Sequence, residues 1–246
     1  MRRGVRFRHG LQRLIGRIVG PLWLPLASFV LRVILGYRMD GLKEVRAEFL
    51  RIRQQSTAPL LICANHLTLI DSFIVAWALA PTWRYMVRFD ELPWNTPERR
   101  NFAATVLSQV LVYLAKCIPI SRGGSREQIS SVLARIGYLL SRGELALVFP
   151  EGGRSRSGRV TTDSVAWGVG RIVASLPQCR VACIYLRGET QESWGSIPNV
   201  GDRFYAKVEC IEPKSEYRGA RRSRDLANQI VAQLARMEKE YFDGRQ

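Results

Sequence analysis

The sequence has few histidines and no paired cysteine motif, and these shortages exclude several kinds of site. Only His9 and His66 occur in 246 residues, so a zinc site built from histidine and cysteine is not expected. The five cysteines are odd in number and include no C-x-x-C pair, which gives no support to a disulfide framework. We therefore expect a protein of a reducing compartment and predict no metal ligands.

Acidic residues are scarce as well. The chain has 21 Asp and Glu against 37 Lys and Arg, a net charge of +16, and no acidic residue precedes Asp40. A nucleic-acid-binding protein would account for the charge, but only five of the basic residues are lysines and no nucleic-acid-binding motif occurs. No nucleic-acid partner is therefore expected.

A long uninterrupted apolar run is also missing. The best candidate lies between Arg17 and Arg32, where 14 uncharged residues are interrupted by Pro21 and Pro25, whereas a bilayer span needs about 20. We expect residues 1–40 to form an amphipathic helical membrane anchor that does not cross, held by anionic lipids on the cytoplasmic face of the inner membrane. A pair of buried core helices and a cleaved signal peptide are the alternatives.

Residues 41–246 alternate between strand-like and helix-like segments and predict a single catalytic domain. The expected strands are 60–64, 85–88, 145–149, 180–186 and 204–211, and the expected helices are 68–79, 99–115, 125–141, 165–176 and 223–242, the last capped by Ser223. This alternation predicts an α/β fold with a mixed central β-sheet flanked by helices. Catalytic residues should lie where strands run into loops.

The first such junction is Asn65-His66-Leu67-Thr68-Leu69-Ile70-Asp71, directly after the strand at 60–64. Thr68 and Asp71 form a T-x-x-D capping pattern, which places the helix start at Thr68 and lets His66 fold back towards the first turn. A carboxylate there could accept the imidazole N–H and leave the other ring nitrogen ready to take a proton. The alternative is that Asp71 only caps the helix and His66 only satisfies a buried acceptor.

The second junction is Phe149-Pro150-Glu151-Gly152-Gly153-Arg154-Ser155, at the end of the strand at 145–149. Pro150 stops the strand, and the two glycines allow backbone N–H groups to approach a ligand closely. Glu151 and Arg154 offer opposite charges at the tip of the loop. Alone, this loop is compatible with any basic hairpin.

Together, the two junctions resemble the glycerophospholipid acyltransferases, the family that includes the 1-acylglycerol-3-phosphate acyltransferases. The family motif N-H-x4-D is matched by Asn65, His66 and Asp71, and F-P-E-G-T-R-S is matched from Phe149 to Ser155 except that Gly153 replaces Thr. The segment 118–122, ending in Arg122, and the apolar segment 181–186 are similar to two further family blocks. The resemblance extends over residues 42–215.

The resemblance implies transfer of a fatty acyl group from acyl-CoA or acyl carrier protein to the free hydroxyl of a lysolipid, without a cofactor. The first candidate acceptor is 1-acyl-sn-glycerol-3-phosphate, in phospholipid biosynthesis. His66 would be the general base and Asp71 would stabilise its imidazolium. Substrate-binding residues by the same analogy are Asn65, Arg122, Glu151, Gly152, Gly153 and Arg154, with the two glycines as candidate oxyanion donors.

One departure from the family affects the acceptor. Family members often carry a lysine a few residues past the second motif, but residues 160–168 contain none and include Asp163. This difference leaves open a phosphate-free lysolipid or a pathway-specific acceptor. A thioesterase and a non-catalytic membrane scaffold remain as further alternatives.

Overall fold

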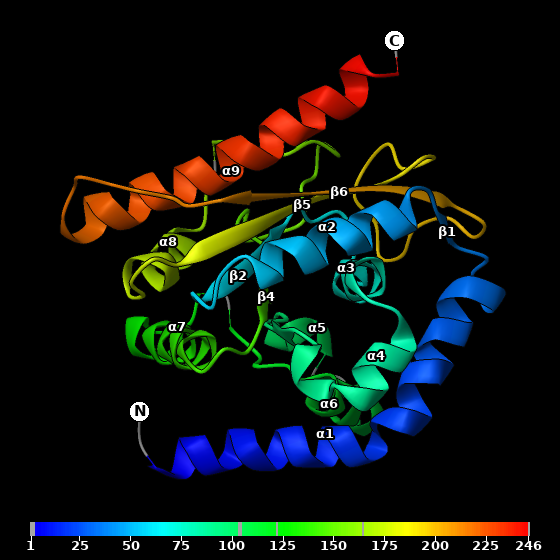
Figure 1. The fold of residues 1–246 in the computed structure, drawn as a ribbon, viewed down its shortest axis with the longest axis horizontal. Coiled ribbons are helices and arrows are strands. Elements are labelled where there is room, and N and C mark those ends of the chain that lie inside the picture. The colour runs from blue at the N-terminus through cyan, green and yellow to red at the C-terminus, as the bar shows by residue number, and fades with distance from the viewer. Residues whose placement is uncertain (1–2, 103–104, 122, 164, 246) are drawn as a thin grey trace.

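The computed structural model describes residues 3–102, 105–121, 123–163 and 165–245, and within them a six-stranded sheet forms the centre of the fold (Figure 1). The strand order is β1-β6-β5-β2-β4-β3. Only the β5–β6 pair is antiparallel among these strands. The strands are β1 (Arg38–Met39), β2 (Leu60–Ala64), β3 (Trp94–Asn95), β4 (Ala146–Val148), β5 (Arg180–Gly188) and β6 (Arg203–Ile211). The predicted α/β fold with a mixed sheet is therefore confirmed.

Helices cover both faces of this sheet. The helices α7 (Arg126–Ser141), α8 (Trp167–Ala174) and α9 (Gly219–Asp243) pack on one face, and α2 (Leu42–Gln54) and α3 (Asp71–Leu79) pack on the other. Successive strand residues point to opposite faces, so Leu61 belongs to the first core and Ile62 to the second. Burial on both faces explains why β2 reads as a continuous apolar run.

The region between β2 and β4 differs most from the sequence prediction. Residues 85–88, predicted as a strand, lie largely in the helix α4 (Thr82–Val87), which is followed by a 3-10 turn at Phe89–Glu91. Its Tyr85 is buried, and the Tyr85 hydroxyl donates to the carbonyl of Ala76 over 2.7 Å. The predicted helix at 99–115 is two helices, α5 (Arg99–Phe102) and α6 (Val106–Leu114). A capping box between Thr105 and Ser108 begins the second.

Two predicted helix starts are displaced. The helix α3 begins at Asp71, not Thr68, because residues 68–70 form a turn around the Asp71 carboxylate. The helix α9 begins at Gly219, so Ser223 lies inside it and caps nothing. Ser223 is buried where α9 meets α8, and a Cβ on Gly170 of α8 would collide with the Ser223 carbonyl. This close contact explains a glycine in the middle of α8.

The N-terminal segment is one long helix, α1 (Arg3–Phe29), which continues as a π-helical turn at Val30–Ile34. Pro21 and Pro25 lie inside α1, so the two prolines that interrupt the apolar run in the sequence do not end the helix. A proline removes one backbone hydrogen bond and bends a helix without ending it when neighbouring elements support the helix, and α1 bends in Figure 1. The 31 residues Gly4–Ile34 are long and apolar enough to cross a membrane.

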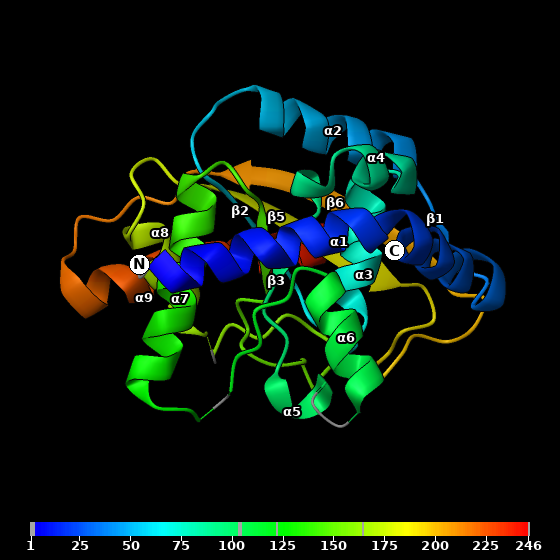
Figure 2. The same ribbon diagram turned by 90° about the horizontal axis from the view of Figure 1, so that it is seen from below.

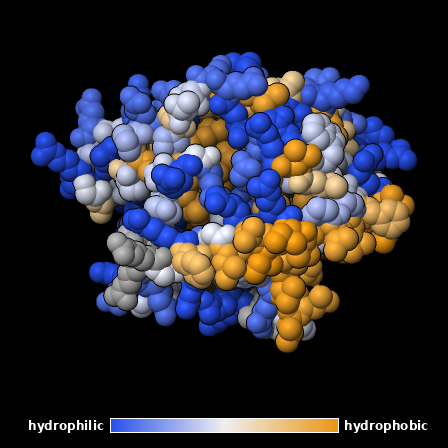
Figure 3. Space-filling view, turned by 60° about the horizontal axis from the view of Figure 1, so that its bottom comes forward, coloured by the Kyte–Doolittle hydropathy of each residue, from blue (hydrophilic) through white to orange (hydrophobic). Residues whose placement is uncertain are grey.

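The helix α1 lies along the domain and is buried on one side only (Figure 2). Of the most apolar 18-residue stretch within Gly4–Ile34, 22% is buried, which argues against the alternative of buried core helices. His9, Gln12, Leu24 and Leu31 are on the packed side. The opposite side is an exposed apolar stripe of Phe7, Leu11, Leu14, Ile18, Leu22, Leu26, Phe29 and Val33. Figure 3 shows this stripe as part of an apolar patch on the surface.

Candidate active site

The two junctions meet at one edge of the sheet because their strands are parallel neighbours. Strand β2 pairs with β4 so that Cys63 lies opposite Val148. The residues that follow, His66 after β2 and Phe149 after β4, therefore leave the sheet side by side. Segments some 85 residues apart in sequence are thus brought into one site. The backbone N–H of His66 donates a hydrogen bond to the carboxylate of Glu151 across this junction.

His66 and Asp71 form a hydrogen-bonded pair. The Nδ1 atom of His66 lies 3.1 Å from Oδ2 of Asp71, and the two side chains are 12% and 5% exposed. The Asp71 carboxylate also accepts the backbone N–H groups of Leu67 and Thr68, at 2.6 and 2.7 Å, and the Thr68 hydroxyl. These bonds hold the carboxylate in place. With Nδ1–H donating to Asp71, Nε2 keeps its lone pair and can take a proton.

Phe149 supports the imidazole from one side. Its ring stacks on the His66 ring with centroids 4.0 Å apart and planes at 15°. Phe149 is part of the second sequence motif, but the motif alone indicates no role for it. Its position could have indicated this role, because Phe149 is an aromatic residue directly after β4, and β4 pairs with the strand that precedes His66. The stacked ring fixes the plane in which the imidazole lies.

Glu151 joins the two junctions. One carboxylate oxygen accepts the His66 backbone N–H over 3.0 Å, and the other accepts the Thr161 N–H over 3.2 Å. Burial raises the pKa of Glu151 to about 7, although these two backbone hydrogen bonds act in the opposite direction. In addition, the Ser155 N–H donates to the His66 carbonyl over 2.9 Å. The Glu151 side chain therefore positions the turn that carries His66.

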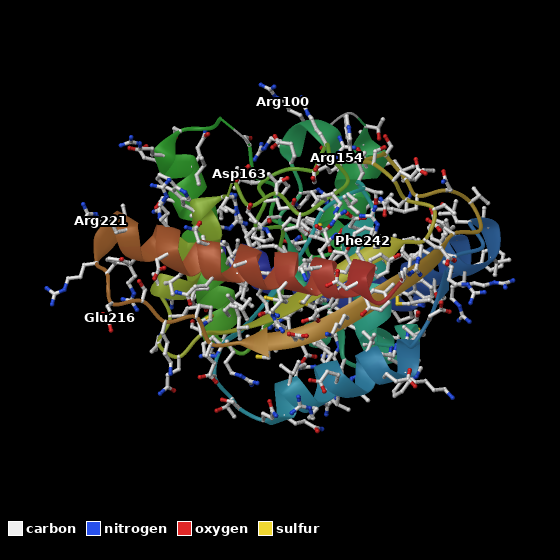
Figure 4. The ribbon with its side chains drawn as sticks, turned by 90° about the horizontal axis from the view of Figure 1, so that it is seen from above. Arg100, Arg154, Asp163, Glu216, Arg221 and Phe242 are labelled. Carbon is white, nitrogen blue, oxygen red and sulfur yellow. The ribbon has the colours of Figure 1, made fainter. Side chains whose placement is uncertain are left out.

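The C-terminal helix holds the far part of the same loop. Both carboxylate oxygens of Glu238, on α9, lie 3.1 Å from the Val160 backbone nitrogen, and the Arg159 guanidinium lies 3.2 Å from one of them. The guanidinium of Arg159 also lies 3.9 Å from the ring centroid of Phe242, which Figure 4 labels near the end of α9. Glu238 was absent from the predicted site because nothing in its helical pattern marks it.

Two of the predicted substrate-binding side chains are engaged elsewhere. The Asn65 amide donates to the Leu186 carbonyl over 2.9 Å and accepts the Leu186 N–H over 2.8 Å, so it ties β2 to β5. The Arg154 guanidinium donates to the Gly195 carbonyl over 2.7 Å and lies 4.6 Å from the ring centroid of Trp194. Arg154 and the exposed Asp163 come from the same loop (Figure 4). Arg122 lies outside the described residues.

The glycines of the second junction make a tight turn. Gly152 has φ +67°, and a Cβ there would lie 2.9 Å from the Cβ of Ala166. Its N–H donates to the Phe149 carbonyl over 3.1 Å. Of the two predicted oxyanion donors, the Gly152 N–H is therefore already used in the turn, which leaves the Gly153 N–H as the remaining candidate.

A cavity of about 380 Å³ opens beside His66. Its apolar wall comes from α7, β4 and α8 and consists of Ile129, Leu133, Ile136, Val148 and Val169. Its lining also includes the polar residues Ser72, Thr96, Glu98 and Ser121. Among the described lining residues there is no lysine or arginine. The described part of the chain also holds no cluster of metal-ligating side chains.

Comparison with known proteins agrees with this geometry. The family model of the acyltransferases matches residues 44–187, which is more than half of the chain and includes both junctions. No curated protein matches the sequence. The match over the region that brings His66, Asp71 and Glu151 together shows that the chain belongs to the acyltransferase family.

Proposed function

We propose that this acyltransferase moves a fatty acyl group from the thioester of acyl-CoA or acyl carrier protein to the free hydroxyl of a lysolipid, with 1-acyl-sn-glycerol-3-phosphate as the first candidate acceptor, in phospholipid biosynthesis. The observation that carries the proposal is the His66–Asp71 pair, which lies beside a cavity with an apolar wall. A hydroxyl is a poor nucleophile at neutral pH, so a positioned base is the main requirement.

The reaction is a direct transfer. Nε2 of His66 takes the hydroxyl proton as the oxygen attacks the thioester carbonyl, and Asp71 stabilises the imidazolium. The C–S bond then breaks, and the imidazolium returns the proton to the leaving thiolate. A base of this kind contributes about 10² to 10⁴ in rate. Cys63 is not a competing nucleophile, since its thiol is fully buried and burial raises the pKa of Cys63.

The cavity wall is suited to an alkyl chain. Ile129, Leu133 and Ile136 are spaced along one face of α7 and line the cavity together with residues of α8 and β4. Sites for small ligands are mostly apolar with a few polar groups, as here. The acyl chain of the donor would lie against this wall, with its thioester carbon next to His66.

The choice of acceptor head group depends on which charged residues face the cavity. Asp163 is exposed and does not line the cavity, so the missing lysine does not leave an acid in the site. Both chain neighbours of Arg122, Ser121 and Gly123, do line it. By the family resemblance, a phosphate acceptor would depend on Arg122. A phosphate-free lysolipid is the second candidate, favoured by the lack of a cation among the described lining residues.

The deciding experiment is a thiol-release assay with long-chain acyl-CoA and acyl carrier protein, run across a panel of lysolipids and with wild type and His66→Ala side by side. Thiol release that requires a lysolipid and produces the diacyl lipid supports the proposal. Release that is equally fast without any lysolipid would identify a thioesterase. No release with either donor on any acceptor would favour a non-catalytic scaffold at the cytoplasmic face of the membrane.

A further inference from the structure

A groove of about 490 Å³ lies between α1 and α6, separate from the His66 cavity. The helix α1 crosses α7 and runs beside α6 (Figure 2). Three arginines line the groove, Arg8 on α1, Arg99 at the start of α5 and Arg135 on α7. Its remaining lining includes the apolar Leu11, Val112 and Pro119. The groove thus combines cations with apolar walls.

These three cations have no acidic partner in the part of the chain that the structure describes. Within that part, neither Arg8 nor Arg99 forms an ion pair or a side-chain hydrogen bond. Among the described residues, the Arg135 guanidinium donates only to the imidazole of His9, over 3.0 Å. Burial lowers the pKa of Arg135, and the neighbouring Arg8 charge lowers it further. Like charges gathered without a counterion are unfavourable in the free protein, and an anion in the groove would relieve that repulsion.

The surfaces on both sides of the groove are apolar and exposed. On one side is the exposed stripe of α1, and on the other is α6, a nine-residue helix with no buried residue. Val106 and Leu107 of α6 are 78% and 69% exposed. Figure 3 shows apolar residues gathered on this face. Arg100, beside α6, is exposed and points outward (Figure 4). Apolar residues bordered by cations are typical of a surface that enters an anionic leaflet.

The groove and the active-site cavity share a wall. Residues 95–98 and 117–120 run side by side as extended segments, with the Ile120 N–H donating to the Pro97 carbonyl over 3.0 Å. Glu98 and Ile120 line the His66 cavity, whereas their neighbours Arg99 and Pro119 line the groove. Successive side chains of an extended segment point to opposite sides, so neighbouring residues can line different hollows. A ligand in the groove would therefore contact the wall that leads to residue 122.

From these observations, we infer that Arg8, Arg99 and Arg135 bind the phosphate of an anionic bilayer phospholipid in the groove between α1 and α6, while the exposed faces of both helices enter the leaflet. The site is separate from the acyl transfer chemistry, because it needs neither His66 nor a thioester. It extends the membrane contact beyond the N-terminal 40 residues to α6. Binding in this groove would also place residues 95–98 and 117–120, the wall shared with the His66 cavity, next to the lipid surface.

The test compares two charge-matched double variants of the full chain, Arg8→Gln with Arg99→Gln and Arg218→Gln with Arg221→Gln. All four arginines are exposed, and Arg218 and Arg221 lie at the start of α9, where Figure 4 labels Arg221. Binding is measured by flotation with vesicles of phosphatidylglycerol and phosphatidylcholine, and with phosphatidylcholine alone. We expect the groove variant to bind anionic vesicles about tenfold more weakly than wild type, and the control pair to lose less than about twofold.

Each other result would overturn the inference. Equal losses in the two variants would mean that only overall charge matters. If the groove variant binds vesicles as wild type does, and wild type is a dimer while the variant is a monomer, the face would be assigned to a second copy of the chain. Inorganic phosphate, at matched ionic strength, is the soluble probe: if it raises the melting temperature as much as anionic vesicles do, the groove is a free-anion site. Because binding is the readout, a protein without transferase activity still gives an answer.

Discussion

His66 and Glu151 are 85 residues apart in the sequence and are joined by a 3.0 Å hydrogen bond from the His66 backbone N–H to the Glu151 carboxylate. The bond is made by the main chain, so it positions the histidine without touching its ring. The imidazole is then oriented by Asp71 and Phe149. Placement of the turn and orientation of the ring are therefore controlled by different residues, which can be tested separately.

The first prediction concerns pH and stability. Burial raises the pKa of Glu151 from its ordinary value of 4.5 to about 7, so the folded protein holds this proton more tightly than the unfolded chain. The free energy of unfolding should therefore fall as pH rises through this range, by up to about 3 kcal/mol, and stay lower above it. Urea unfolding of wild type and Glu151→Gln between pH 4 and 8 measures the effect.

The difference between the two proteins is the relevant quantity, because His9 acts in the opposite direction. Burial lowers the pKa of His9 to about 4, with the Arg135 charge adding to the effect, so the contribution of His9 to stability rises with pH up to the ordinary histidine pKa of 6.5. A wild-type profile that runs parallel to that of Glu151→Gln would show that the Glu151 carboxyl has an ordinary pKa.

The second prediction is that His66→Ala removes acyl transfer and leaves the melting temperature close to that of wild type. The reason is loss of the general base, worth about 10² to 10⁴ in rate. Asp71→Asn should lose activity and stability together, since Asp71 also accepts the N–H groups of Leu67 and Thr68. The assay is thiol release with wild type alongside. A His66→Ala enzyme with more than about a tenth of the wild-type rate would contradict the base assignment.

The third prediction tests the stripe on α1. Ile18 and Leu22 are 68% and 76% exposed, so Ile18→Glu with Leu22→Glu should leave the fold intact. Vesicle binding should weaken by about tenfold or more, because two apolar side chains no longer enter the leaflet. Activity should fall on a vesicle-borne acceptor and persist on a short-chain soluble one.

Substitution is preferable to deleting residues 1–40, since α1 and the turn after it supply the buried Leu24 and Leu31. The matched control is Tyr217→Glu, at a residue 57% exposed in the loop before α9. If the α1 variant and this control bind vesicles as wild type does, the anchor lies elsewhere on the protein.

The fourth prediction concerns the head group. If the acceptor carries a phosphate, Arg122→Ala should raise its KM sharply, since a charge-assisted contact is worth about 1.5 to 3 kcal/mol. A phosphate-free lysolipid should be far less affected. Comparing kcat/KM for lysophosphatidate and a neutral lysolipid, in wild type and Arg122→Ala, separates the cases. Equal losses on the two acceptors would mean that Arg122 shapes the site and does not recognise phosphate.

The parts of the structure that the sequence predicts well are those determined by local pattern. Strand β2 and the capping box of α7 are found where they are expected, because an apolar run after Pro59 and the pair Ser125 and Gln128 are local signals. Periodicity fails at 85–88, since a run of four residues cannot separate a strand from a helix, and packing of Tyr85 decides for the helix.

The partners of the site residues could not be predicted for a different reason. The motif letters locate Asn65, Glu151 and Arg154, but their contacts come from tertiary structure. Asn65 bonds to Leu186, 121 residues away, and no local pattern indicates that pairing. The groove is a similar case, because Arg8 and Arg135 come together only when α1 packs across α7.

The bond between Glu238 and the Val160 N–H has a consequence for the order of events during synthesis. The loop that carries Glu151 is held by a helix that follows it in the chain, so this contact can form only after both Val160 and Glu238 have been synthesised. With chains growing at about 5 to 20 residues per second, roughly 10 to 40 s separate the synthesis of α1 from that of Glu238. The exposed apolar stripe of α1 is therefore present on the growing chain before the Glu151 loop can be held by α9.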